Sequence, residues 1–271
     1  GNETLNFELP LPANHLQIDL DADALGRNFE VEVGLQADAV AAVPALVEAL
    51  GAVATEDGWG IRVAEAAASA RRRHRADIGA HADLCDAIRK RLPRRSPIVR
   101  DVTIPGSSWG NRLLAVYHPT DNLYAAGGGI GQGLAMSIGA AVARPGVPVL
   151  AIVGDGGVQV HLGELAVLAA ERPDLVVVLF NDGGYGVLRN LQHAAGKPGR
   201  AVDLATPDFG KLADALGLRH RRIGDVESFD KALRKALKKG GPTIIEVDAT
   251  ALEPRPLDLV PPSIVPEQVR A

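Results

Sequence analysis

Cysteine is almost absent from this sequence, and its scarcity limits what can hold the fold together. Cys85 is the only cysteine among 271 residues, so no internal disulfide can form. Stable disulfides mark oxidising compartments, and nothing in the sequence indicates one. The sequence therefore predicts a cytoplasmic protein without disulfide support.

Long apolar runs and a strong excess of charge are also missing. The longest apolar stretch, 134–153, is interrupted by Arg144 and by Pro or Gly at 145, 146 and 148, which argues against a membrane span. A net charge of −4 gives no electrostatic basis for binding nucleic acid. The one basic cluster, residues 71–75, lies in an alanine-rich helical stretch and indicates a solvated helix face or a subunit contact. We predict partners other than nucleic acid or membrane.

Two hydrophobic runs that each end in an acidic corner are the most informative feature present. Residues 149–153 lead into Gly-Asp-Gly at 154–156, and residues 175–180 lead into Asn-Asp-Gly-Gly at 181–184. The intervening stretch, 162–172, has apolar residues at helical spacing and is followed by a proline. Strand, helix and strand form a βαβ unit, whose two strands are parallel and commonly neighbours.

The two corners predict a cation site. Asp155 and Asp182 would stand at the same carboxyl end of the sheet, on strands roughly 4.8 Å apart. Two ionised carboxylates at that spacing repel each other unless a cation lies between them, and a divalent metal with oxygen ligands is the natural choice. Either motif alone is ordinary turn chemistry. Their combination is what points to a metal.

Alternating helices and strands set the expected fold class, an α/β fold with a mostly parallel sheet and helices on both faces. We expect helices near 81–92, 130–143, 208–216 and 228–239, the last with Ser228 as N-cap, and strands near 97–102, 218–223 and 243–248.

The expected domains follow from the same patterns. Residues 81–250 form the main α/β domain, and 52–80 form a helical linker. Residues 1–51 hold strands at 16–20 and 31–33 and a helix from about 37 to 50, which is too little for a domain and resembles the tail end of one. The proline-rich stretch 251–271 is expected to lie extended on the surface.

A glycine-rich segment at 127–133 precedes the expected helix 130–143 and invites a dinucleotide-binding interpretation. The spacing excludes it, because neither G-x-G-x-x-G nor G-x-x-x-x-G-K-[ST] occurs in the chain. A nicotinamide-dependent oxidoreductase is disfavoured for the same reason.

The GDG corner, the Asn-Asp corner and the preceding glycine-rich loop together resemble the cofactor signature of thiamine diphosphate enzymes, and the two corners are here separated by the 24 residues 157–180. The stretch 124–248 looks like the cofactor-diphosphate-binding domain of the acetolactate synthase and benzoylformate decarboxylase superfamily, and 15–51 resembles the end of its middle domain. Residues 181–192 are closer to the decarboxylases than to the biosynthetic synthases. The fold implied is the thiamine diphosphate-binding fold.

The resemblance implies a set of site residues. Mg²⁺ would be held by Asp155, Asp182 and the carbonyl of Gly184, with Asn181 as the alternative side-chain ligand. The family normally has Asn where this chain has Asp182, so tighter metal dependence is a hypothesis. The other expected contacts to the cofactor are Gly128 (through its carbonyl), Ile130 (as the wedge that bends the cofactor), Gly154, Gly156, Gly157, Tyr185, Gly186 and Thr103.

Three residues are expected at the substrate, with core packing as an equal alternative for the leucines: Tyr124, Leu188 and Leu191. Tyr185 could likewise be a core aromatic instead of a diphosphate contact. His118, His161 and His193 lie nearest the motifs, and none is assigned a catalytic role.

The resemblance also implies the reaction and what it requires. Thiamine diphosphate would attack the carbonyl of a 2-oxo acid and release carbon dioxide, giving either an aldehyde or, after a second carbonyl compound is captured, a carboligation product. The activating glutamate of this family lies in an amino-terminal pyrimidine-binding domain, which we expect on a longer chain or on a partner subunit of a homo- or hetero-oligomer, a dimer or tetramer. A non-catalytic cofactor-binding partner subunit is the remaining alternative.

Overall fold

The computed structural model describes residues 14–52 and 58–259. The chain divides into two compact units, residues 1–68 and 69–271. The boundary falls within helix α2 (Trp59–Ile78), inside the stretch expected to be a helical linker. Within the described residues, no helix is both long and apolar enough to cross a membrane.

The described part of the first unit contains a small parallel sheet, a largely apolar helix and the first half of α2. Strands β1 (Leu16–Asp19) and β2 (Val33–Gln36) pair in parallel with Leu16 opposite Val33, and the short turn η2 (Ala22–Ala24) lies between them. Helix α1 (Ala39–Leu50) is capped by Asp38, whose carboxylate accepts from the Val40 amide at 2.8 Å. Strand β2 begins at Val33, two residues later than the strand expected at 31–33, and the glutamates at 30 and 32 lie outside the strand pairing.

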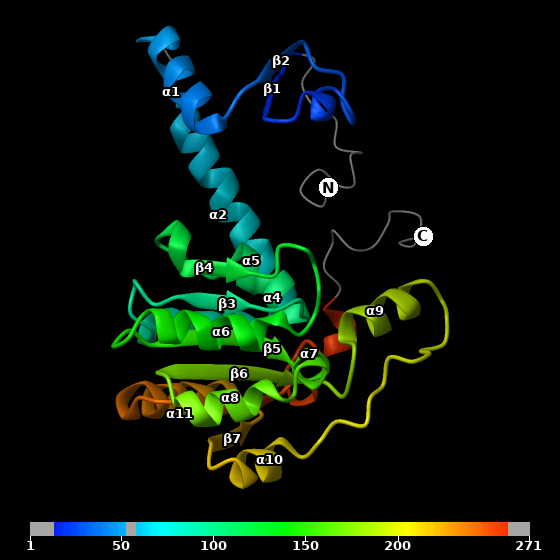
Figure 1. Cartoon of the computed structure of the whole chain (residues 1–271). Helices are drawn as coiled ribbons and strands as arrows, with labels where there is room; N and C mark the ends of the chain where they lie inside the picture. Colours follow the sequence, from blue (N-terminus) through cyan, green and yellow to red (C-terminus); the bar gives the residue numbers. More distant parts are fainter. Residues whose placement is uncertain (1–13, 53–57, 260–271) are drawn as a thin grey trace. The chain divides into compact units, whose positions relative to one another are not determined.

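The second unit is built on a six-stranded sheet in which every neighbouring pair is parallel (Figure 1). The strand order is β4-β3-β5-β6-β8-β7. The strands are β3 (Ile98–Arg100), β4 (Asn122–Tyr124), β5 (Val149–Gly154), β6 (Leu175–Asn181), β7 (Arg219–Ile223) and β8 (Thr243–Asp248). The expected parallel α/β fold is confirmed.

Helices connect these strands and cover the sheet. The helices are α3 (Ala80–Arg91), α4 (Ile104–Ser107), α5 (Trp109–Arg112), α6 (Gln132–Ala143), α7 (Asp155–Val160), α8 (Glu164–Glu171), α9 (Gly186–Ala194), α10 (Phe209–Ala215) and α11 (Val226–Lys239). Single 3₁₀ turns occur as η3 (Pro119–Asp121), η4 (Ala249–Ala251) and η5 (Pro256–Asp258).

The pleat of the central strands divides the core into two layers. In β6, Val176 and Val178 face the layer completed by α3 and α11, whereas Val177 and Leu179 face the layer completed by α6 and α8. All four valine and leucine side chains are at most 1% exposed. Alternating side chains point to opposite faces of a strand, so a run that is apolar throughout must be covered on both. This is why β5 and β6 read as continuous hydrophobic runs.

Two further expectations, the start of the last helix and the surface position of the proline-rich stretch, were wrong. Helix α11 is capped by Asp225, whose carboxylate accepts from the Ser228 amide at 2.8 Å, so the helix begins earlier than a Ser228 cap would allow. The described part of the proline-rich stretch, 251–259, does not simply lie on the surface. Leu252, Pro256 and Leu259 are buried there, because this segment packs against α9 and the end of the sheet. Residues 260–271 lie outside the described residues.

The strand order places a crevice at the carboxyl end of the sheet. From β3 the chain moves outward to the edge strand β4, then crosses back past β3 to β5, and continues in the other direction to β6. The loops after β3 and β5 therefore diverge. In open α/β sheets, ligands bind at such a switch point, outside the carboxyl ends of the strands.

Candidate cofactor and metal site

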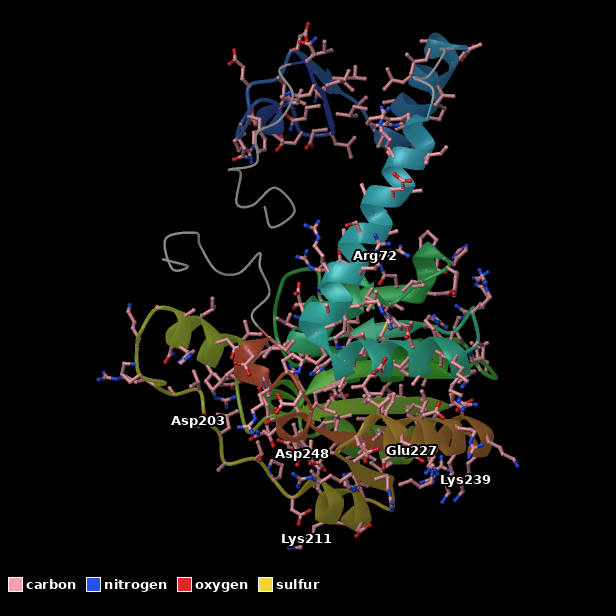
Figure 2. All side chains as sticks on the ribbon, turned by 180° about the vertical axis from the view of Figure 1, so that it is seen from behind. Arg72, Asp203, Lys211, Glu227, Lys239 and Asp248 are labelled. Carbon is pink, nitrogen blue, oxygen red and sulfur yellow. The ribbon has the colours of Figure 1, made fainter. Side chains whose placement is uncertain are left out.

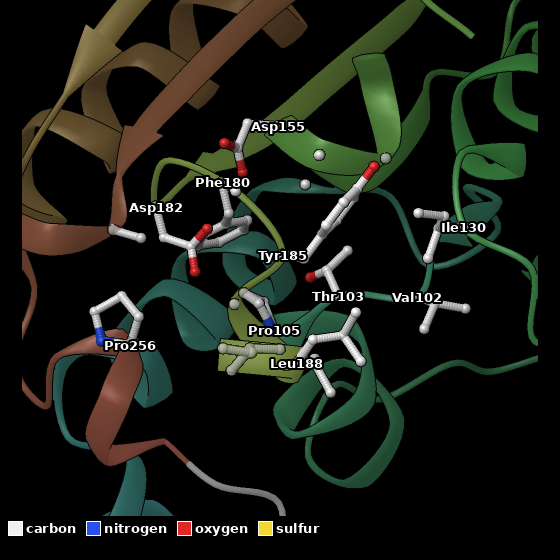
Figure 3. Close-up of a pocket in the computed structure, with 18 of the residues that line it drawn as sticks. Val102, Thr103, Pro105, Ile130, Asp155, Phe180, Asp182, Tyr185, Leu188 and Pro256 are labelled. Atoms are coloured by element: carbon white, nitrogen blue, oxygen red, sulfur yellow. The ribbon is translucent and has the colours of Figure 1, made fainter. Parts of the chain in front are cut away.

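A cavity of about 270 Å³ opens at this switch point (Figure 3). The loops that follow β3, β4, β5 and β6 all contribute to its lining, together with α3 and the segment after β8. Of the residues expected at the cofactor, it is lined by Thr103, Gly128, Ile130, Gly154, Asp155, Gly156, Gly157, Asp182, Gly184, Tyr185 and Gly186, and of the expected substrate residues by Leu188.

Asp155 is the buried acid of the cavity. It begins α7, directly after β5, and is 1% exposed. Its Oδ2 has no hydrogen-bond partner. A buried polar atom without a partner carries a large desolvation cost, and a bound cation would remove it. Burial, with the charge of Asp182 added to it, raises the pKa of the Asp155 carboxyl well above its ordinary value.

Asp182 lies opposite, just beyond the end of the neighbouring strand β6 (Figure 3). Burial raises the pKa of this carboxyl too, against the opposing effect of the Arg189 guanidinium, whose Nη1 lies 3.3 Å from Asp182 Oδ2. For both acids burial is the main cause of the raised pKa, and the Arg189 guanidinium beside Asp182 does not outweigh it. A divalent cation between them would supply further positive charge.

Gly184 is the position at which the third oxygen ligand, a carbonyl, is expected, and its neighbours explain why the position is a glycine. A Cβ here would overlap the carbonyl oxygen of Val202, since the corner is bound to the 202–204 segment. The Tyr185 amide donates to Val202 O at 2.8 Å, and the Leu204 amide donates to Gly183 O at 2.9 Å. The Gly184 carbonyl oxygen is directed toward the start of α7, 3.0 Å from where a Cβ on Gly156 would stand.

Glycines also allow the loops to approach one another. A Cβ on Gly156 would stand 2.8 Å from the Tyr185 ring, and one on Gly157 would stand 2.7 Å from Asp101 Oδ2. The Tyr185 ring therefore lies against the start of α7, and Tyr185 also lines the cavity (Figure 3). Thr103 caps α4, with its hydroxyl accepting from the Gly106 amide at 3.4 Å.

The donor set suits a hard cation that is shared with a ligand. No group of three or more His, Cys, Asp or Glu side chains is arranged to hold a metal in the described ranges. Two carboxylates and one carbonyl leave coordination positions for other oxygens. Mg²⁺ is characteristically bound in this way, by one or two carboxylates plus phosphate oxygens and water.

Three of the expected site residues lie outside this cavity. Asn181 lines a second, polar cavity, where its side-chain amide donates to Glu246 Oε1 at 2.8 Å and its carbonyl accepts from the Gly183 amide at 3.2 Å. Tyr124 is 57% exposed, and the Arg100 guanidinium carbon lies over its ring, 5.5 Å from the ring centroid of Tyr124. Leu191 is half-buried on α9 and is absent from the lining.

Sequence reasoning missed several residues of the cavity. His81 is 1% exposed on α3, its Nδ1 accepts from the Trp109 indole at 3.3 Å, and its ring stacks on Phe180. Burial lowers the pKa of His81 to about 4, so the imidazole is neutral at physiological pH. Pro256 and Leu259 also line the cavity. No motif marks these positions, because they reach the site only through folding.

Comparisons with known proteins identify the family. The sequence profile described as "Thiamine pyrophosphate enzyme, C-terminal TPP binding domain" matches residues 106–247, just over half of the chain. The resemblance to thiamine diphosphate enzymes that the motifs indicated is thereby confirmed.

Individual relatives include both synthases and decarboxylases. The Mycobacterium tuberculosis protein IlvX, named as an acetolactate synthase large subunit, is 33% identical over 236 residues, which is 82% of this chain and 44% of the relative. Benzoylformate decarboxylase of Pseudomonas aeruginosa is 29% identical over 175 residues, 64% of this chain and 32% of the relative.

A solved structure, the Rhodococcus jostii thiamine diphosphate-dependent 4-hydroxybenzoylformate decarboxylase, shares the fold with a TM-score of 0.68 and 22% identity, over 88% of this chain and 44% of that one. The chain thus spans less than half the length of the curated relatives it matches. With its profile match and its parallel α/β fold, the chain belongs to the thiamine pyrophosphate enzymes, as a bearer of their C-terminal cofactor-binding domain.

Proposed function

We propose that this chain is the cofactor-binding half of a thiamine diphosphate- and Mg²⁺-dependent 2-oxo acid decarboxylase or carboligase. The observation that carries the proposal is the buried pair Asp155 and Asp182, facing each other across a cavity at the switch point, with one carboxylate oxygen lacking any partner. When both carboxyls are ionised, a bound cation would offset their repulsion, and the family's cofactor carries the diphosphate that accompanies such a cation.

In this proposal different residues of the cavity bind the metal, the diphosphate and the aminopyrimidine ring. Asp155, Asp182 and the Gly184 carbonyl hold Mg²⁺, and Thr103, the glycines after β5 and the start of α9 surround the diphosphate. Gly128 and Ile130, in the loop after β4, receive the aminopyrimidine end. Bound thiamine diphosphate would supply the carbanion chemistry. The protein contributes binding, orientation and exclusion of water.

The substrate end of the proposed site is apolar. Val187 and Leu188, at the start of α9, lie with Pro105 and Ile104 along the same cavity. This lining supports a small 2-oxo acid with an apolar substituent. Product analysis with pyruvate and with an aryl 2-oxo acid separates decarboxylation from acetolactate-type carboligation: an aldehyde alone supports the first, and a 2-hydroxy ketone or acetolactate supports the second.

Catalysis in this proposal also needs a pyrimidine-binding domain, from the same polypeptide or from a partner subunit of a dimer or tetramer. The lengths of the relatives support this requirement, since each extends well beyond the part that the chain matches. The apolar surface of the first unit gives further support. Val40, Val43 and Val47 of α1 are 49–84% exposed, although side chains of this kind are usually buried.

Calorimetry with thiamine diphosphate, with and without Mg²⁺, tests the cofactor assignment. We expect binding that requires Mg²⁺ and that strengthens when an amino-terminal domain is added. An absence of binding both alone and with that domain would refute the cofactor role. Binding without turnover under both conditions would favour the alternative, a non-catalytic partner subunit.

A further inference from the structure

The metal corner has one more charged neighbour, Arg189, which lies on α9 seven residues after Asp182. Its Nη1 is 3.3 Å from Asp182 Oδ2, and its Nε is 2.9 Å from Asp203 Oδ1. The arginine side chain is only 16% exposed. A buried guanidinium between two carboxylates is held in a defined orientation, because its planar group presents donors in a fixed fork.

The two acids that Arg189 joins come from different parts of the chain. Asp182 follows β6, whereas Asp203 lies on the long stretch between α9 and α10 and is 78% exposed (Figure 2). Backbone hydrogen bonds connect the same two segments, through the bridge between Gly184 and Asp203 and the flanking bonds of Tyr185 and Leu204. Arg189 therefore spans a junction that already determines where the Gly184 carbonyl lies.

The charge balance of the proposed site suggests a role for Arg189. A site with two carboxylates and one divalent cation is neutral before any ligand arrives, so a diphosphate brings an uncompensated negative charge into a buried position. Within the described part of the chain, Arg189 is a cation that contacts one of these acids, Asp182. It donates to Asp182 Oδ2, so Oδ1 is the oxygen that we expect at the metal.

We propose that Arg189 is a positioning residue for the metal ligand Asp182: it holds one carboxylate oxygen, offsets the carboxylate's charge beside the diphosphate, and is itself oriented by Asp203. The inference rests on the proposed cofactor function and goes beyond it. It assigns a role in cofactor affinity to an ion-pair chain, Asp182–Arg189–Asp203, whose outer member lies at the surface.

The test measures metal and cofactor affinity separately in Arg189→Gln. Once the guanidinium is removed, it no longer competes with the metal for the Asp182 carboxylate. Mn²⁺ alone, followed by electron paramagnetic resonance, should therefore bind at least as tightly as in the parent chain. Thiamine diphosphate at saturating Mg²⁺, followed by calorimetry, should bind roughly tenfold more weakly, as expected for the loss of a charged hydrogen bond. Asp203→Asn should shift cofactor affinity in the same direction by less.

A double-mutant cycle with Asp182→Asn shows whether Arg189 acts through that carboxylate. In the Asp182→Asn background, Arg189→Gln should change cofactor affinity by less than about twofold, because no extra negative charge remains to be offset. The matched control is Arg200→Gln, an exposed arginine on the same stretch and outside the cavity lining, which should leave both affinities unchanged.

The outcomes distinguish this inference from the proposed function. An equal loss in both backgrounds, or a parallel loss of Mn²⁺ and cofactor binding, would show that Arg189 only supports the fold and would overturn the inference. Unchanged cofactor affinity in Arg189→Gln would also overturn it while leaving the cofactor function intact. If the parent chain binds no thiamine diphosphate even with Mg²⁺ and an amino-terminal domain, both fall together.

Discussion

The side-chain amide of Asn181 donates to Glu246 Oε1 at 2.8 Å, which turns Asn181 away from the cofactor cavity although it is the immediate neighbour of Asp182. Its carbonyl oxygen accepts from the Gly183 amide and so closes the turn on which Asp182 stands. The geometry supports Asp182, and not Asn181, as the proposed side-chain ligand. Glu246 is fixed in turn by His220 Nε2 at 2.7 Å.

Replacing Glu246 by Gln should reduce stability at neutral pH and flatten its dependence on acid. Although burial raises the pKa of Glu246, hydrogen bonds from His220 and Asn181 outweigh it, and the pKa lies below its ordinary value. A depressed folded-state pKa contributes stability that is present above the unfolded pKa and is lost as pH falls through the folded one. Urea denaturation from about pH 3 to 7 should show that loss in the parent chain.

In Glu246→Gln the acid-dependent loss should be smaller, and stability near pH 7 should be lower by about 1–3 kcal/mol, because the charged hydrogen bonds are weakened. The control is Glu171→Gln, at the exposed end of α8. An unchanged acid profile in Glu246→Gln would show that the network does not couple to folding.

Asp155→Asn should stabilise the metal-free protein while abolishing Mg²⁺-dependent cofactor binding. Because burial and Asp182 raise its folded-state pKa, Asp155 favours folding below its ordinary pKa, and this contribution is lost as pH rises through the raised value. Removing the charge should therefore increase the free energy of unfolding near pH 8 by on the order of 1–3 kcal/mol.

Denaturation of the metal-free protein at pH 6 and pH 8 tests this sign. The gain from Asp155→Asn should be larger at pH 8. Asp214→Asn, an exposed aspartate on α10, should show no such gain. If Asp155→Asn instead destabilised the metal-free chain at pH 8, the carboxylate would have to be stabilised by contacts other than a bound cation.

Gly186→Ala should weaken cofactor binding by displacing the proposed metal ligand Asp182. A Cβ at this position would overlap Asp182 Oδ2, because the carboxylate folds over the first residue of α9. We expect a loss of at least tenfold in Mg²⁺-dependent thiamine diphosphate affinity, measured by calorimetry, and destabilisation of about 1–3 kcal/mol.

Gly139→Ala is the matched control for that substitution. Gly139 lies on α6, also within a helix, and a Cβ there meets nothing within 4 Å. Alanine should stabilise this position by up to about 1 kcal/mol. Equal cofactor affinity in Gly186→Ala and the parent chain would mean that Asp182 can move aside without consequence, contrary to a fixed metal corner.

Asp121→Asn should destabilise the second unit. Asp121 is fully buried, and its carboxylate forms ion pairs with Arg95 at 2.8 Å and Arg144 at 2.6 Å. These ion pairs connect the start of the edge strand β4 to the end of α6 and to the loop before β3. Arg95 is 58% exposed and Arg144 is 31% exposed, so water can solvate both guanidinium groups in the variant, and we expect a loss of about 1–3 kcal/mol from the weakened charged hydrogen bonds. Urea denaturation measures it, and a cost below 1 kcal/mol would show that solvent screens the pair.

Local sequence patterns were sufficient where the chemistry is local. The apolar runs of β5 and β6, the helix between them and the glycines that follow predicted a parallel pair with two acids at one edge, and the register of Gly154 opposite Phe180 places them there. The helix cap at Asp225 was missed because Ser228 is also a good N-cap residue, and only the observed backbone distinguishes the two.

Contiguous residues encode the βαβ unit, the two acidic corners and the family, because each has a period or a turn that backbone and side-chain physics restricts. Which side of the sheet each neighbour of a motif faces depends on the tertiary fold. That fold turned Asn181 toward Glu246, placed Arg189 against Asp182, and brought His81 and Pro256 into the cavity. These contacts join residues that are distant in the chain or on opposite sides of one turn, and no local pattern encodes such pairings.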